Sequence, residues 1–151
     1  MNKPRENIMI FVDASGGRSV DRIWAEDVAY WCVKKLMPRV KNLEIDIAIK
    51  KLDVSGYCMR VSDKQYEIEI ARGMSLIDFV STICHEMVHV RQFVRKQLRH
   101  EGDEWVWKAS RKHNIHRVHD EEYDKAPHEI EAHALEMPLA LEFLKQCKLG
   151  M

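Results

Sequence analysis

The segment His85-Glu86-Met87-Val88-His89 is the feature that most restricts how this chain can fold. On an α-helix, two histidines four residues apart lie one above the other on the same face, so both imidazoles can reach one metal ion. Glu86 lies one step further round, where it can contact a water molecule on that ion without binding the ion itself. The motif therefore predicts a helix that carries a metal site, and zinc suits histidine ligands.

The residues around the motif predict the helix that it needs. Ser75 has the hydroxyl of an N-cap residue, and Asp78 follows three positions later, where a capping box usually has a glutamate. The apolar residues recur at helical spacing and are Leu76, Phe79 or Val80, Ile83, Met87, Val90 and Val94. His85, His89 and Gln92 fall on another side, so we expect a helix anchored by the face opposite its metal site. Two surface histidines flanking a glutamate by chance are the alternative.

Length and composition favour one globular domain over residues 1–151, with a sheet-bearing part at 1–74 and the site helices at 75–151. The chain has 151 residues, 46% of them hydrophobic, and a formal net charge of zero, so no global field attracts nucleic acid or anionic lipid. The N-terminal apolar run at 9–12 is too short for a signal peptide or a membrane span. We therefore expect a cytoplasmic protein with no membrane contact.

The first 74 residues predict strands and one helix. Residues 8–12 are a continuous apolar run, typical of a buried strand, and an amphipathic helix follows from Val20 to Leu36, where Pro38 ends it. Apolar and polar residues alternate over 43–49, 57–61 and 66–70. Because the links between these segments are short, we expect an antiparallel meander. The fold class is thus α+β, with a small, mostly antiparallel twisted sheet.

The chain after the motif helix is polar before it becomes helical again. Residues 99–126 predict a surface excursion, with a short helix near 103–112. Pro127 occupies the first-turn position that proline prefers, and a final helix follows in which Pro138 causes a kink or a new start.

A catalytic zinc site needs a third protein ligand, and the final helix offers two. Glu129 is separated from His89 by 39 intervening residues (positions 90–128), and His133 lies four residues further on the same helical face. One of them can bind the metal while the other supports the site. An acidic first turn that complements the helix dipole is the alternative for Glu129.

The runs HEMVHVRQ and YDKAPHEIEAH resemble the gluzincin-type, SprT-like or zincin-like metallopeptidase domains found among phage and bacterial hypothetical proteins. The resemblance covers roughly residues 75–137 and implies a zincin-like domain holding one zinc ion per chain through His85, His89 and Glu129. It also implies a protein or peptide substrate that pairs with an edge strand, at 65–71 or 57–61, and the host cytoplasm if the chain is phage-encoded. In this chain, His128 replaces the tryptophan usual after the proline. The SprT group itself uses a histidine as third ligand, so its role at DNA–protein crosslinks is not carried over.

The resemblance implies hydrolysis of a peptide bond. Zinc would polarise the carbonyl and lower the pKa of a bound water, and Glu86 would act as general base. The oxyanion donor could be Tyr123, His119 or His133.

Three other interpretations stay open. The first is a zinc-binding regulatory or interaction domain without proteolysis. The second is accessory DNA binding through cations near the end of the motif helix, namely Arg91, Arg95, Lys96, Arg99, Lys108, Arg111 and Lys112. The third is a separate metal site at His113, His116 and His119. The cysteines Cys32, Cys58, Cys84 and Cys147 show no paired spacing and are expected to be structural thiols.

Overall fold

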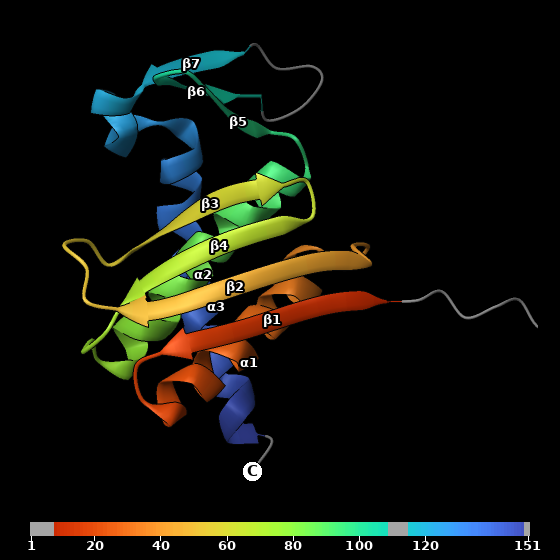
Figure 1. The fold of residues 1–151 in the computed structure, drawn as a ribbon, viewed down its shortest axis with the longest axis vertical. Helices are drawn as coiled ribbons and strands as arrows, with labels where there is room; N and C mark the ends of the chain where they lie inside the picture. Colours follow the sequence, from red (N-terminus) through yellow and green to blue (C-terminus); the bar gives the residue numbers. More distant parts are fainter. Residues whose placement is uncertain (1–7, 109–114, 150–151) are drawn as a thin grey trace, which may run out of the picture.

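A four-stranded sheet forms one layer of the molecule, and helices lie behind one of its faces (Figure 1). The computed structural model describes residues 8–108 and 115–149. The elements in chain order are β1 (Met9–Gly16), α1 (Ser19–Leu36), β2 (Asn42–Lys50), β3 (Gly56–Ser62), β4 (Gln65–Ala71), α2 (Leu76–Val94), β5 (Leu98–Glu101), β6 (Glu104–Trp107), β7 (His116–His119), the 3-10 helix η1 (Asp120–Lys125) and α3 (Pro127–Leu149). The α+β class is confirmed.

The predicted antiparallel meander is wrong, because the main sheet is mixed. Its strand order is β1-β2-β4-β3, with β1 and β4 both parallel to β2 and only β3 antiparallel to its neighbour β4. The chain does reverse between β2 and β3, but the two strands leave room for β4 between them. The physical reason is burial: Tyr66, Ile68 and Ile70 of β4 are fully buried, whereas β3 is mostly exposed, so the more apolar strand takes the interior position.

One face of the sheet forms the core with the helices. In β2 the alternate residues Leu43, Ile45, Ile47 and Ile49 are buried, and in β4 Tyr66, Ile68 and Ile70 lie beside them in register. β1 was predicted as a buried strand over 8–12, but it is longer and lies at the sheet edge. Its residues alternate, with Phe11 exposed and Val12 buried.

The helix that carries the motif begins where its sequence predicts. Ser75 is the N-cap of α2, and its hydroxyl accepts a hydrogen bond of 3.3 Å from the Asp78 amide. α3 starts at Pro127, as predicted, and continues as one helix through Pro138. Helix α2 therefore lies between the sheet and α3, where it contacts β3 and β4 on one side and α3 on the other.

The polar segment after α2 forms a second, smaller sheet. β5, β6 and β7 pair antiparallel in that order, and this sheet lies beyond β3 at one end of the molecule (Figure 1). The helix predicted near 103–112 is therefore wrong for residues 104–107, which form β6, and residues 109–114 lie outside the described part of the chain. None of the helices described combines the length and the apolar stretch that crossing a membrane requires.

Candidate metal centre and adjoining cleft

The two motif histidines and Glu129 converge where α2 packs against the start of α3. The Nε2 atoms of His85 and His89 are 3.2 Å apart. Glu129 places Oε1 2.5 Å from His85 Nε2 and Oε2 3.0 Å from His89 Nε2. The fold thus brings Glu129 next to two histidines that precede it by 40 and 44 positions, so three side chains able to bind a metal lie together.

These donors fit a zinc ion. Zinc bonds of about 2.0–2.1 Å to nitrogen and oxygen hold neighbouring donors about 3.3 Å apart in a tetrahedron. Two of the three separations are already close to that value. The Glu129 atom Oε2 is buried and has no partner in hydrogen-bonding geometry among the described residues, although His89 lies beside it. A buried, unsatisfied carboxylate oxygen is costly unless a cation accompanies it.

Glu129 has the electrostatics expected of an ionised ligand. Burial alone would raise its pKa, but the contacts with His85 and His89 outweigh burial and hold the pKa well below its usual range. His85 shows the opposite shift: burial lowers its pKa, and Glu129 and Glu86 more than offset this. Glu129 therefore carries a negative charge at neutral pH.

Glu86 lies buried beside this cluster. Its side chain is 3% exposed, and one carboxylate oxygen lies within 4.8 Å of ligand atoms of His85 and His89. Burial raises the pKa of Glu86 to about 7, although His89 and His85 lower this pKa in part. A carboxylate with a pKa near neutrality can both take up and release a proton at physiological pH.

Glu86 gives the metal-free protein a pH-dependent stability that a Glu86→Gln variant lacks. Its folded pKa of about 7 exceeds the usual 4.5, so its stabilising contribution is present at low pH and is lost as pH rises through 7. From pH 5 to 8, the variant should therefore gain about 2 kcal/mol of unfolding free energy relative to wild type. Urea unfolding with a chelator at both pH values measures the difference, and a pH-independent difference would contradict a raised pKa.

A buried amide orients His89. Gln92 is 0% exposed, and its Oε1 lies 2.8 Å from His89 Nδ1. Its Nε2 donates to the His128 carbonyl at 3.0 Å and to Glu131 Oε1 at 3.1 Å, which fixes the amide orientation. His89 Nδ1 must therefore be the donor in its contact, and Nε2 keeps its lone pair toward the cluster. The sequence holds one signal for this contact, namely the spacing of three residues between His89 and Gln92.

Replacing Gln92 by Leu should weaken zinc binding about 10- to 100-fold, because the imidazole loses the partner that fixes its tautomer and orientation. Competition with a chromophoric chelator measures the dissociation constant. Circular dichroism checks that the variant is folded. An unchanged zinc affinity in a folded variant would show that Gln92 serves packing alone.

Glu136 and His133 flank the other histidine of the motif. Glu136 Oε1 lies 3.5 Å from His85 Nδ1 and 2.6 Å from His133 Nδ1. His133 Nε2 reaches Glu129 at 3.4 Å, but its side chain is 60% exposed. His133 can thus join His85 and Glu129 in an alternative ligand set, while Glu129 contacts both motif histidines. No sequence signal pointed to Glu136.

The structure separates the other two candidate oxyanion donors. Tyr123 lies next to the cluster, where burial and a hydrogen bond to Glu129 raise the pKa of its phenol, so the hydroxyl stays protonated. His119 lies in β7 with Nε2 2.7 Å from Asp103, and it is not among the described residues that line the cleft beside the cluster. Tyr123 is therefore the better placed of the two.

A cleft of about 950 Å³ opens beside the cluster, between β3, the end of α2 and the small sheet. Its lining comprises Tyr57, Cys58, Met59, Arg60, Asp63, His89, Phe93, Lys96, Leu98, Arg99, His100, Trp105, Asp120, Tyr123 and His128. Since β3 is the last strand of the sheet, residues 57–61 are an edge as predicted, while 65–71 is interior and that alternative is wrong. The volume of the cleft lies within the range of ligand-binding clefts in proteins.

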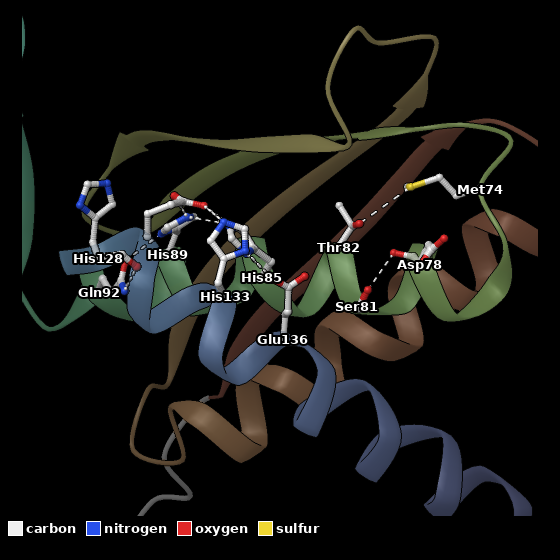
Figure 2. Close-up of polar contacts among 11 residues, drawn as sticks. Met74, Asp78, Ser81, Thr82, His85, His89, Gln92, His128, His133 and Glu136 are labelled. Atoms are coloured by element: carbon white, nitrogen blue, oxygen red, sulfur yellow. Dashed lines mark hydrogen bonds and ion pairs between the residues drawn. The ribbon is translucent and has the colours of Figure 1, made fainter. Parts of the chain in front are cut away.

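His128 lies at the end of a row of imidazoles (Figure 2). The ring centres of His133, His85, His89 and His128 are separated by 4.7, 4.9 and 5.6 Å in turn. Burial lowers the pKa of His128 to about 4, so the ring is neutral at physiological pH.

Three of the cations considered for DNA binding have partners within the described part of the chain. Arg91 pairs with Glu131 at 3.2 Å, Arg95 donates to the Leu36 carbonyl, and Arg99 pairs with Glu101. Arg111, Lys112 and His113 lie outside the described residues, so the separate site with His116 and His119 stays a prediction. The four cysteines are free thiols, with Cys32 and Cys84 in contact in the core at 3.8 Å.

The chain was compared with protein-family models, with curated proteins and with solved structures. No family model, no curated protein and no solved structure matched the chain. Function must therefore be argued from the site itself.

Proposed function

We propose that the chain is a zinc-dependent peptidase. The observation that carries the proposal is the convergence of His85, His89 and Glu129 beside the buried carboxylate of Glu86, next to a cleft of about 950 Å³ that His89 lines. Three protein ligands leave one position open for chemistry, as in catalytic rather than structural zinc sites.

Each residue of the site has a distinct task in this proposal. When bound, zinc supplies a Lewis acid that polarises the scissile carbonyl and lowers the pKa of water. Glu86 takes the proton of the attacking water and delivers it to the leaving amine, for which a pKa of about 7 is suited. The Tyr123 hydroxyl, adjacent to Glu129, is the protein donor placed to stabilise the oxyanion.

The edge strand β3 offers a way to hold an extended substrate. The Ala71 amide donates to the Ser55 carbonyl at 2.8 Å, which makes this pair a hydrogen-bonded rung of the β3–β4 ladder. The rungs alternate in an antiparallel pair, so the backbone of Cys58 and Arg60 faces the free edge. A peptide can add there as a further strand.

Cleavage of unfolded proteins and of a mixed peptide library tests the proposal. Cleavage should stop with a chelator and return when zinc is restored. Cleavage that persists in chelator would contradict a metal-dependent mechanism. Binding of one zinc per chain without cleavage of any substrate would instead support a regulatory or interaction domain.

A further inference from the structure

The wall of the cleft beside His89 contains a buried polar side chain, His128, whose ring nitrogens lack hydrogen-bond partners among the described residues. His128 is 1% exposed, and neither Nδ1 nor Nε2 has a hydrogen-bond partner within the described part of the chain. Buried polar groups are nearly always partnered, and an unpartnered one costs stability. Because His128 lines the cleft, a bound ligand is a natural source of the missing partner.

Aromatic rings surround this histidine. The ring centre of His128 lies 5.1 Å from Trp105, 5.2 Å from Tyr123 and 5.6 Å from His89, and Phe93 lies 6.2 Å from Trp105. Phe93, Trp105, Tyr123 and His128 all line the cleft. Such a lining favours a flat, apolar group that carries one hydrogen-bonding atom.

The charged residues of the cleft do not favour an acidic ligand. Arg60 is paired with Asp63, Arg99 shares Glu101 with Arg117, and Lys96 and Asp120 add one charge of each sign to the lining. A carboxylate placed against His128 and its aromatic neighbours Trp105 and Tyr123 would lose its hydration among rings that carry no cationic side chain.

We propose that the cleft beside His89 is a specificity pocket for a tyrosine side chain of the substrate, with His128 hydrogen-bonded to the phenol. This inference rests on the proposed peptidase function for its placement next to the scissile bond. A phenol can donate to the lone pair of the imidazole or accept from its N–H, so either ring nitrogen can be satisfied. Phenylalanine fills the same space but leaves His128 unpartnered, so the site rejects it.

Direct binding tests the pocket independently of cleavage. Four capped pentapeptides, alike except for a central Tyr, Phe, Leu or Asp, are titrated calorimetrically into the full-length Glu86→Gln protein loaded with zinc, which keeps the peptides intact. The tyrosine peptide should bind about tenfold or more tightly than the phenylalanine peptide, as expected for one buried hydrogen bond. In the double variant with His128→Phe, the two peptides should bind within twofold of each other.

Several results would overturn the inference. Equal binding of the Tyr and Phe peptides, tightest binding of the Leu or Asp peptide, or no binding at all would each do so. A tyrosine preference that survives His128→Phe would show that another residue is responsible. Because the wild-type histidine is retained in the first comparison, the test does not depend on the variant folding.

These titrations, read together with the cleavage assay on the wild-type protein, separate this inference from the function on which it rests. Tyrosine preference in a protein that cleaves nothing would leave the pocket in place and overturn the peptidase. Zinc-dependent cleavage without a preference for tyrosine would do the reverse.

Discussion

The Glu86→Gln variant is expected to keep its zinc and lose about 10²- to 10⁴-fold in kcat, the range that general-base catalysis contributes. The glutamine has nearly the same volume and fits the same buried position, but it cannot accept the proton of the attacking water. Since Glu86 is not among the three proposed ligands, zinc content should stay at one ion per chain. Hydrolysis of the best library peptide, followed together with metal analysis, measures both quantities.

Metal content is the control that gives this result its meaning. A variant that lost both zinc and activity would assign Glu86 to the ligand set with His85 and His89, a group whose ligand atoms also lie close together. Wild-type activity in a zinc-loaded Glu86→Gln protein would show that Glu86 is not the general base.

Replacing Glu129 by Ala is expected to weaken zinc binding by more than about 100-fold, because removing even an outer partner of a ligand costs 10- to 100-fold. Glu129 contacts both motif histidines, so its loss leaves a two-histidine site. The metal-free variant should still fold. Competition with a chromophoric chelator measures the change.

Two variants of the same helix serve as comparisons for Glu129→Ala. Glu142→Ala, at an exposed position that pairs with Lys35, should bind zinc as wild type does. His133→Ala should change the affinity less than Glu129→Ala, since His133 is largely exposed and touches only His85 and Glu129 within the cluster. Loss of zinc in His133→Ala with retention in Glu129→Ala would move the third ligand to the histidine.

Local sequence signals predicted the two helices of the site. Helical spacing, the Ser75 cap and Pro127 depend on residues within one turn of each other, so both starts could be placed from the sequence. That Glu129 meets the motif was predicted from two observations: Glu129 and His133 share one face of the final helix, and the family resemblance makes Glu129 a ligand.

Pairings between distant segments were not predictable in the same way. β4 lies between β2 and β3 because its buried face is more apolar than that of β3. The short links between these strands instead favoured pairing in chain order. The β5–β6 hairpin was missed because its four-residue strands are too short for a clear alternation. The contacts of Glu136 with His85 and of His128 with Trp105 join different elements and leave no periodic signal.

Anomalous diffraction from a zinc-loaded crystal, recorded on either side of the zinc absorption edge, tests the proposed metal site most directly. We expect one anomalous peak per chain, about 2.0–2.2 Å from His85 Nε2, His89 Nε2 and a Glu129 oxygen. A peak bound by His85 and His133 without His89, or no peak between α2 and α3, would contradict the proposed site.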